Sequence, residues 1–577
     1  MTSRRCRPVL RVAQALVIAL VSLAPARPVA ADDVYLRSGW FNASHYDMVM
    51  PLWLDDMTIA RTYNSSSYKG IFGTGWETRL ETNLEVEDNG SIVVHEYGGG
   101  AYNEFSPTNK SARSESSIAA ELVNVAGQSG LFGNDAEIGA YKTWLQENHA
   151  KEWARFRDLG LVTPQQSHAG ETFSSGRFGE NQVITRVPEG YQRATEGGEK
   201  FEAFDLSGRL QRVWDVNRNF IALSYANGRL AEISDNFGNR FAFSFTKLGF
   251  VEKIAGSNGR TARFEYQGAY LTKVTDATGS SYQYTYDSLH RMTGIGYPDG
   301  KWKKIAYYSS KTDQATSDYV VKRIDDRDGT STDYVYKKPD DTHYNVDLTT
   351  TDAAGKVSNL EDRFVLRPGT GVADVSSVWD LESVVTDGKT TKQNAYTNGR
   401  LTQITTPTGS TVYGYDNAGR PVSATSAAWT ITWVYDEATG HVSAAKREGS
   451  NAESWQFAYD NRGNLAHATD SGGDDVTLSY DEHGRRIAAA DNGQTIRFTY
   501  DPLFEPVKLS LDGVGSAEIA YNEIGEIKKV SGSAAGAVDA KLNALIKIIQ
   551  SAIVPTSEDL LSQDTLTALG KAVAVAK

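Results

Sequence analysis

The chain has 577 residues, of which 59 are Lys or Arg and 72 are Asp or Glu, so its net charge at pH 7 is −13. Because an acidic chain is repelled by phosphate groups, we expect neither a nucleic-acid partner nor binding to an anionic membrane surface. Apolar residues make up 40% and aromatic residues 10% of the chain, enough to bury a large core and to favour strands.

Residues 1–31 have the layout of a secretory signal peptide. Arg4 and Arg5 give a basic start, residues 12–23 are mainly apolar, and Ala30 and Ala31 supply small residues before a cleavage point. The apolar run is too short to span a bilayer comfortably, although an uncleaved anchor is the alternative. We expect an exported chain, in the periplasm, at the cell surface or outside the cell, without a stable membrane span after cleavage.

Cleavage would also remove the single cysteine, Cys6. The remaining chain would then form neither a disulfide nor a thiolate metal site. Five basic residues and no acidic residue leave with the signal, so the net charge falls from −13 to −18.

Two segments follow the signal before any clear repeat. Residues 32–109 alternate short strand-like stretches with glycine turns and are predicted to form an N-terminal β domain. Residues 110–170 carry apolar and aromatic residues at helical spacing and are predicted to form a helical insertion whose aromatic stripe packs on a sheet. The residues of this stripe are Ile138, Tyr141, Trp144, Leu145, Trp153, Phe156 and Leu159, with Gly160 as the stop signal.

Residues 171–530 repeat a Tyr-Asp pair about every twenty residues. The tyrosines Tyr415, Tyr435, Tyr459, Tyr480, Tyr500 and Tyr521 are separated by 20, 24, 21, 20 and 21 residues. The first five precede Asp416, Asp436, Asp460, Asp481 and Asp501; glycines follow at Gly419, Gly463, Gly484 and Gly525, and arginines at Arg420 and Arg485. An earlier, looser series includes Tyr286 and Asp287. A period held over more than three hundred residues indicates a repeat architecture.

The physical unit of this repeat is a β-hairpin. Tyr282, Tyr284 and Tyr286 occupy alternate positions and so share one face of a strand. Asp287 can accept a hydrogen bond from the backbone two residues on and start a turn, and a glycine can close that turn in the left-handed conformation. Because one hairpin cannot bury its own apolar face, the hairpins must stack into a sheet. We therefore interpret the repeated Tyr and Asp residues as structural rather than as ligands or catalysts.

The repeat resembles that of the Rhs, or YD-repeat, proteins. Residues 415–420 and 480–485 match the pattern Y-D-x-x-G-R in full, and residues 61–65 with 70–76 resemble the domain that precedes Rhs repeats. The resemblance covers about residues 35–105 and 185–530. It implies a bacterial protein whose ribbon of β-hairpins spirals into a hollow shell, which in many members encloses a C-terminal toxin. The predicted fold is thus mainly β, a long array of stacked β-hairpins curling into a shell or trough.

Residues 531–577 depart from the repeat. Residues 531–536 have a flexible linker composition, and Leu542, Leu545, Ile546, Ile549 and Ile553 predict the first of two short amphipathic C-terminal helices. Many family members carry a D-P-x-G motif that closes the shell and cuts off the toxin. Here Asp501-Pro502 lacks the glycine and lies inside a repeat, so self-cleavage and toxicity do not carry over.

The chain lacks the short motifs of zinc proteases, serine hydrolases and phosphate-binding loops. Asp326-Arg327-Asp328-Gly329 is a fragment of a calcium loop, but it lacks the distant glutamate, so an ordinary hairpin turn is favoured. We expect no catalytic residue, no cofactor and no bound metal.

Three functions remain open. The first is an exported, non-enzymatic Rhs-type scaffold or shell that encloses or displays a partner polypeptide. The second is a cell-surface carbohydrate-binding protein or adhesin, because exposed aromatic rings on a long sheet can stack on sugars. The third and weakest is a remnant or carrier of a polymorphic toxin system. The expected partners are accordingly an enclosed or docked protein, or glycans.

Overall fold

The computed structural model divides the chain into two compact units. It describes residues 33–541, except for 37, 51–56, 66–68, 97–100, 110–111, 164–166, 176–178, 196–199, 216–217, 310–318, 341, 367–378, 387, 398–399, 417–419, 437–439, 483–484, 502–505, 522–526, 533, 535 and 539–540. One unit contains the residues up to Trp76 and those from Asp215 onward, and the other is Glu77–Trp214. The expected signal peptide and the two expected C-terminal helices beyond residue 541 lie outside the described residues.

The first unit begins with a small antiparallel sheet in the order β1-β2-β3-β6. Its strands are β1 (Asp33–Tyr35), β2 (Trp40–Met50), β3 (Met57–Asn64) and β6 (Trp76–Glu77), and the hairpin β4 (Lys69–Gly70) and β5 (Gly73–Thr74) lies between β3 and β6. Alternate residues of β3 are fully buried, from Met57 to Tyr63. One face of this sheet therefore packs against other parts of the unit.

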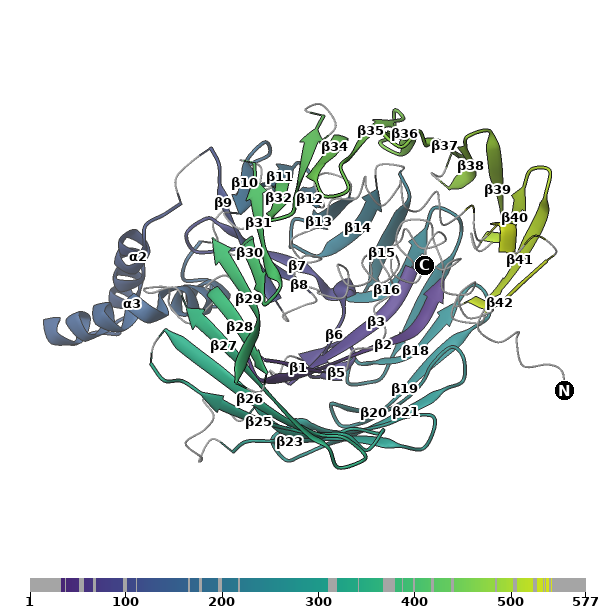
Figure 1. Cartoon of the computed structure of the whole chain (residues 1–577). Coiled ribbons are helices and arrows are strands. Elements are labelled where there is room, and N and C mark those ends of the chain that lie inside the picture. The colour runs from purple at the N-terminus through teal and green to yellow at the C-terminus, as the bar shows by residue number, and fades with distance from the viewer. Residues whose placement is uncertain are drawn as a thin grey trace. The chain divides into compact units, whose positions relative to one another are not determined.

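The rest of the first unit is an array of antiparallel strands in which each strand from β15 to β42 pairs with the next (Figure 1). The first strands are β15 (Phe220–Ala226), β16 (Arg229–Asp235), β17 (Arg240–Phe245), β18 (Val251–Gly256), β19 (Thr261–Gln267), β20 (Tyr270–Thr275), β21 (Ser281–Tyr286), β22 (Met292–Gly296), β23 (Trp302–Tyr307), β24 (Val321–Asp325), β25 (Ser331–Lys337), β26 (His343–Thr351), β27 (Val357–Leu366), β28 (Trp379–Thr386) and β29 (Lys389–Thr397).

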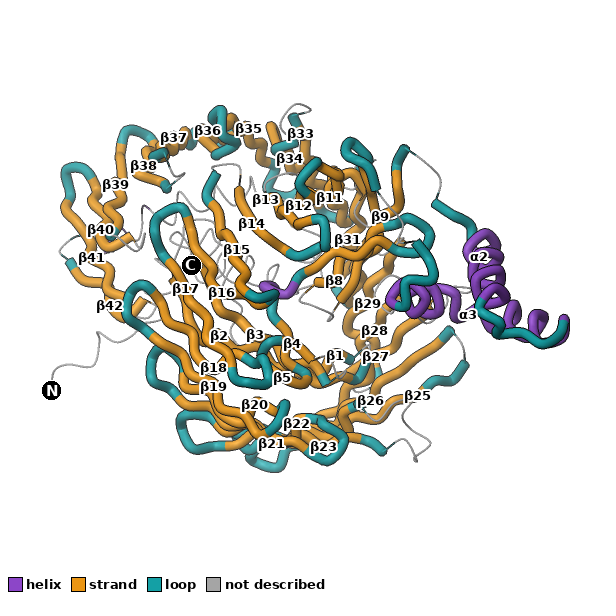
Figure 2. Tube along the Cα trace, turned by 180° about the vertical axis from the view of Figure 1, so that it is seen from behind, coloured by secondary structure: helices purple, strands orange, loops and turns teal. Residues whose placement is uncertain are grey.

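The array continues with β30 (Arg400–Thr406), β31 (Gly409–Tyr415), β32 (Pro421–Ser426), β33 (Trp429–Tyr435), β34 (Val442–Gly449), β35 (Glu453–Tyr459), β36 (Leu465–Asp470), β37 (Asp475–Tyr480), β38 (Arg486–Asp491), β39 (Gln494–Tyr500), β40 (Pro506–Leu511), β41 (Gly515–Tyr521) and β42 (Ile527–Ser531). The prediction of a mainly β chain built from stacked hairpins is confirmed (Figure 2).

A β-bulge recurs at the same point of each repeat. The register shifts immediately before Tyr286, Tyr415, Tyr480 and Tyr500, and the same shift precedes the repeat aromatic of the other hairpins that keep the period. The diverged hairpin of β25 and β26 pairs without a shift. Because a bulge adds one residue to one strand and increases local twist, the repeat aromatic marks a bend in the hairpin as well as its corner.

The second unit contains a ring of seven strands. These are β7 (Asn83–Val86), β8 (Ile92–Glu96), β9 (Ala101–Pro107), β10 (Thr172–Ser175), β11 (Gly179–Val187), β12 (Gly190–Thr195) and β13 (Lys200–Asp205), each paired with the next, with the 3-10 turn η1 (Arg79–Glu81) before them and β14 (Leu210–Asp215) after. The ring closes where Asn83 bridges Arg209, and where Leu84 N–H donates to Gly208 O at 2.8 Å. Closure leaves β7 without an open edge on that side.

The two helices of the insertion, α2 (Glu115–Gln128) and α3 (Asp135–Asp158), lie between β9 and β10 in the sequence (Figure 2). Trp153 and Phe156 of α3 pack with Ile118 and Leu122 of α2, so the aromatic stripe faces its partner helix and the expectation that it packs on a sheet was wrong. The sequence pattern missed this because helical spacing was recognised only in residues 138–159, and no apolar stripe was assigned to the part of the insertion that forms α2. Gly160, with φ of 69°, follows α3 as the expected stop.

Ion pairs hold α3 to the turn between β7 and β8. His149 Nδ1 lies 2.8 Å from Asp88 Oδ2, and Arg157 pairs with Glu85.

The two compact units divide the chain after residues 76 and 214, whereas the domain limits expected from the sequence at 109 and 170 stay predictions.

Gly208 offers a test of the ring closure. Its φ is 81°, and an added Cβ would lie 1.7 Å from the carbonyl oxygen of Leu84. Gly228 has a similar φ of 76°, but an added Cβ there meets no atom within 4 Å. We expect Gly228→Ala to cost about 1 kcal/mol of unfolding free energy from backbone strain alone. Gly208→Ala should cost at least about 3 kcal/mol, because the backbone contact must also break.

Urea denaturation of both variants measures the difference. Equal losses at the two glycines would show that the contact between Leu84 and Gly208 does not stabilise the second unit.

Candidate functional site

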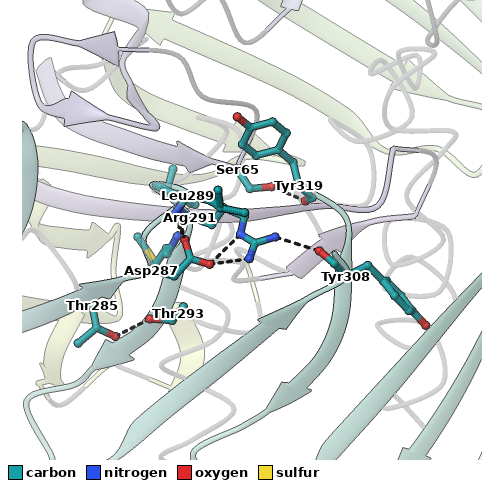
Figure 3. A network of polar contacts seen from close by, with 10 residues as sticks. Ser65, Thr285, Asp287, Leu289, Arg291, Thr293, Tyr308 and Tyr319 are labelled. Atoms are coloured by element: carbon teal, nitrogen blue, oxygen red, sulfur yellow. Dashed lines mark hydrogen bonds and ion pairs between the residues drawn. The ribbon is translucent and has the colours of Figure 1, made fainter. Parts of the chain in front are cut away.

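The carboxylate of Asp287 organises the turn that follows it (Figure 3). Asp287 Oδ1 accepts hydrogen bonds from the backbone N–H groups of Leu289 and Arg291, both at 3.0 Å, and Oδ2 accepts one from Arg291 Nε at 2.8 Å. The backbone closes the same turn, since Asp287 N–H donates to Arg291 O at 2.9 Å. The side chain therefore satisfies turn amides that strand pairing leaves without partners.

The same contacts recur at the other repeat corners. Asp416 holds the backbone N–H of Arg420 at 2.8 Å and its Nε at 2.7 Å, and Asp481 holds those of Arg485 at 2.9 and 2.5 Å. At Asp460 the bonded residue is Asn464, whose backbone and side-chain nitrogens both lie at 2.9 Å. A carboxylate that accepts this many hydrogen bonds within its own turn is poorly placed to act on a substrate.

Hydroxyl groups of several repeat tyrosines link their hairpins to the preceding ones. Tyr286 Oη donates to Leu271 O at 2.9 Å, and Tyr415 Oη donates to Leu401 O at 2.6 Å. Equivalent bonds run from Tyr435 to Pro421, Tyr459 to Val442, Tyr480 to Leu465 and Tyr500 to Arg486, at 2.7, 2.9, 2.8 and 2.8 Å. These hydroxyl bonds therefore fix the spacing of consecutive hairpins at the end where the Tyr-Asp turns lie.

The arginine of one corner also lies over the next repeat aromatic. The guanidinium carbon of Arg420 is 4.4 Å from the ring centroid of Tyr435, and that of Arg485 is 5.2 Å from Tyr500. Where the corner holds a histidine instead, the ring of His441 stacks on Tyr459 at 4.6 Å. Asp, Arg and Tyr therefore form one chain of contacts that passes from hairpin to hairpin.

The remaining motif residues occupy less regular corners. Gly463 takes a φ of 85°, and His290 takes 71° at the glycine position of its own turn. The turn after Asp436 is longer and closes on His441. Asp501 directly follows β39, which ends at Tyr500. The residues Gly419, Gly484 and Gly525, and the side chain of Tyr521, lie outside the part of the chain that the structure describes.

A buried polar seam joins the leading sheet to the array inside the first unit. Arg61 of β3 is fully buried and donates from Nε and Nη2 to Asp47 of β2, at 2.6 and 3.0 Å. Its Nη2 also donates to Tyr284 Oη of β21 at 2.9 Å. Burial raises the pKa of Asp47, against the opposing effect of the adjacent guanidinium, and the two-pronged contact identifies the pair as an ion pair.

Aromatic rings surround this pair. The Arg61 guanidinium carbon lies 4.2 Å from the ring centroid of Trp76, whose indole N–H donates to Tyr286 Oη at 3.0 Å. Tyr63 Oη accepts a hydrogen bond from the backbone N–H of Met292 at 2.8 Å. Burial, with the charges of Arg61 and Lys303, lowers the pKa of His45 well below its ordinary value, so its ring is neutral. The seam was not predicted, because no spacing along the chain relates residues 47 and 61 to residue 284.

Two further hydrogen bonds link residues near the seam to later parts of the array (Figure 3). Arg291 Nη1 donates to Tyr308 O at 2.9 Å, and Ser65 Oγ donates to Tyr319 O at 3.1 Å. The corner motif and the leading sheet therefore meet around β21 to β24.

A continuous apolar face runs along the later hairpins. One buried cluster contains Tyr396, Leu401, Ile404, Tyr413 and Ala424, and a second contains Val442, Ala445, Phe457, Ala468, Val476, Leu478, Ala489, Ile496, Phe498, Leu509, Leu511, Ala517, Ile519, Ala534 and Val538. Half-buried Trp433 packs against both clusters, and Trp455 and Tyr459 pack against the second. Residues on the other face of the same strands, such as Val434 and Ile487, are exposed. The face between β29 and β41 is the candidate partner-binding surface.

The calcium-loop fragment of the sequence forms a turn in the structure. Asp326 and Gly329 close the hairpin of β24 and β25, and Asp326 pairs with Lys303 at 3.1 Å. Within the described ranges, no three His, Cys, Asp or Glu residues are grouped to hold a metal ion. Among the helices described, none is both long and apolar enough to cross a membrane.

The fold and the corner contacts define a β-hairpin repeat protein. Residues 271–301 and 396–428 match the model of the RHS repeat, and each contains a Tyr-Asp corner described above. Residues 31–103 match the model of a domain of unknown function, DUF6531, which covers the leading sheet and its seam residues. These matches confirm the prediction that the chain contains Rhs, or YD, repeats.

Solved structures of Tc toxins show a weaker likeness. The TcdB2-TccC3-Cdc42 structure matches 65% of this chain and 25% of its own at 11% identity, with a TM-score of 0.39. TcdB2-TccC3-TEV matches 88% of this chain and 28% of its own at 11% identity, with a TM-score of 0.36. A mutant Tc holotoxin pore of Photorhabdus luminescens matches 66% and 27% at 11% identity, with a TM-score of 0.24.

The chain thus spans about a quarter of the length of the Tc chains that it matches. Their TM-scores are too low to define a common fold, so the identification of RHS repeats depends on the matched sequence segments alone. No curated protein sequence matches the chain.

The seam is tested by removing one partner of its ion pair. Arg61→Met leaves the Asp47 carboxylate buried without its guanidinium and should cost about 3–5 kcal/mol of unfolding free energy. The double variant Arg61→Met with Asp47→Leu should lose less than the single variant, because no unpaired charge remains buried.

Arg323→Met is the matched control. Arg323 contacts Asp325 at 2.9 Å and Asp333 at 2.6 Å, but its side chain is 39% exposed. Its loss should cost less than about 1 kcal/mol in urea denaturation. Similar losses for Arg61→Met and Arg323→Met would show that the seam does not hold the leading sheet.

Proposed function

We propose that the protein is an exported, non-enzymatic Rhs-repeat scaffold that holds a partner polypeptide against the apolar face between β29 and β41. The observation that carries this proposal is the half-buried state of Trp433, Trp455 and Tyr459 on that face. Large aromatic rings that stay partly open on one continuous surface are typical of protein-binding sites. The RHS repeat matches support the scaffold, and the predicted signal peptide supports export.

The non-enzymatic assignment rests on what the polar groups do. The carboxylate oxygens of Asp287, Asp416 and Asp481 accept hydrogen bonds from the amides and arginines of their own turns. A catalytic carboxylate must instead have an oxygen within hydrogen-bond reach of a substrate. The repeated acidic residues are therefore part of the scaffold.

Affinity capture from the native host tests the proposal. Tagged full-length protein is purified, treated with protease, and the surviving polypeptides are identified by mass spectrometry. We expect a second polypeptide that is protected while bound, and its recovery should fall at least tenfold when Trp433 and Trp455 are both changed to Ser. The matched control changes Val434 and Ile487, which are exposed on the opposite face, to Ser.

Two outcomes would overturn this function. One is a preparation from which no second polypeptide is recovered before protease treatment. The other is equal recovery with the Trp433/Trp455 and Val434/Ile487 variants, which would place the partner elsewhere on the chain.

A second candidate function, glycan binding, is favoured by Trp302 on β23. Its ring lies over Gly294 and Gly296, where an added Cβ would come within 3.3 and 2.8 Å of it, and the side of the ring away from these glycines leaves Trp302 38% exposed. A flat aromatic ring supported on glycine is a surface on which a sugar can stack.

A glycan panel tests this candidate. If Trp302 binds sugars, Trp302→Ala should weaken binding by about tenfold, since stacking contributes about 1 kcal/mol or more. Trp144→Ala, which removes another exposed tryptophan, should leave binding unchanged. Failure of the parent protein to bind any glycan on the panel rejects the candidate.

A further inference from the structure

The chain that follows β42 returns to the apolar face of the array. Ala534 and Val538 are 3% and 1% exposed, and both belong to the cluster formed by β34 to β41. Ala534 N–H donates to Ser516 O at 3.4 Å, and Val538 N–H donates to Ala534 O at 2.9 Å, as in one turn of helix. The segment expected to be a flexible linker therefore contributes buried residues to the core.

A charged contact fixes this return. Lys541 Nζ lies 2.5 Å from Asp491 Oδ2 and 3.0 Å from Asp491 O, at the end of β38. The two side chains are 14% and 4% exposed. A lysine removed from water to this extent needs a close anionic partner, so the contact selects one position of the segment on the sheet.

The three contact residues lie on one side of a helix. Ala534, Val538 and Lys541 stand at positions i, i+4 and i+7, which is the spacing of anchors in a helix that lies in a groove. In a helix that continued beyond residue 541, Leu545, Ile549 and Ile553 would extend this row at intervals of four residues, whereas Lys547 and Ser551 would fall on the opposite side.

We infer that the chain's own segment from Ala534 to Ile553 docks as a helix on the apolar face, with Leu545, Ile549 and Ile553 continuing the contacts of Val538 and Lys541. From Val538 to Ile553 such a helix is about 22 Å long at 1.5 Å per residue. Strands lie about 4.8 Å apart, so it would cross about five strands. The half-buried rings of Tyr480 and Tyr500 pack against the same cluster and offer the surface that it needs.

The inference reaches beyond the proposed function. It assigns the β37–β41 part of the face to the chain itself and leaves the part around β29–β35, with Trp433 and Trp455, for a partner. It holds whether or not a partner polypeptide binds, so its test does not depend on one.

Cysteine labelling of the full-length chain tests the docked helix. Cys6→Ser removes the single native cysteine, and four variants then carry one cysteine each: Leu545→Cys, Ile549→Cys, Lys547→Cys and Ser551→Cys. Rates of reaction with a maleimide are measured at several protein concentrations, and with the protein unfolded in urea as reference. We expect cysteines 545 and 549 to react at least tenfold more slowly than cysteines 547 and 551 in the folded protein.

Equal rates at all four positions would overturn the inference. Protection of positions 545 and 549 that disappears on dilution would also overturn it, because the occupant of the face would then come from a second copy of the chain.

The anchor is tested separately. Lys541→Glu, added to the Leu545→Cys variant, should raise the labelling rate at position 545 at least fivefold through repulsion from Asp491. Lys547→Glu makes the same charge change on the opposite side of the helix and should leave the rate unchanged. Adding Asp491→Lys to Lys541→Glu should restore protection. If Lys541→Glu does not change the rate, Lys541 does not anchor the segment.

Discussion

The whole array depends on how the chain turns its corners. A hairpin corner takes backbone amides out of strand pairing, and dozens of such corners would leave many polar groups without partners. Here repeats with a Tyr-Asp corner supply a carboxylate that accepts the amides of its own turn, as Asp287, Asp416 and Asp481 do. The arginine held by that carboxylate then covers the next repeat aromatic, as Arg420 covers Tyr435. One short motif therefore solves turn closure and hairpin stacking together.

The leading sheet is held to the array by buried side-chain contacts. Arg61 and Asp47 form an ion pair within the leading sheet, and the Tyr284 hydroxyl contacts Arg61 from the array. Hydrogen bonds from Trp76 to Tyr286, and from Met292 to Tyr63, add contacts whose geometry is specific. Burying an ion pair contributes little net stability, but its strict geometry excludes other positions of the sheet. The seam thus fixes where the leading sheet lies on the early hairpins.

The sequence predicts features that repeat or that lie close together along the chain. The hairpin period, the turn role of Asp287 and the stop at Gly160 follow from local chemistry that any twenty-residue window contains. The β-bulge before Tyr286 does not follow from the alternating pattern of the sequence. Contacts such as Arg61 with Tyr284, Gly208 with Leu84 and Lys541 with Asp491 join distant residues. No periodicity of the sequence encodes these contacts, so they can be identified only in the folded structure.

The Tyr hydroxyl bonds have a consequence for how such a chain can change in length. Each one joins a hairpin only to its immediate predecessor, as Tyr480 joins β37 to Leu465 of β36. A corner therefore makes the same contacts whatever number of hairpins stands before or after that neighbouring pair. Duplication or loss of one complete hairpin would regenerate every corner bond, whereas a gain or loss of a few residues would shift an aromatic away from its carbonyl. Relatives of this chain can thus be expected to differ by whole hairpins, with smaller insertions confined to places outside the corner contacts, such as the segment that holds α2 and α3.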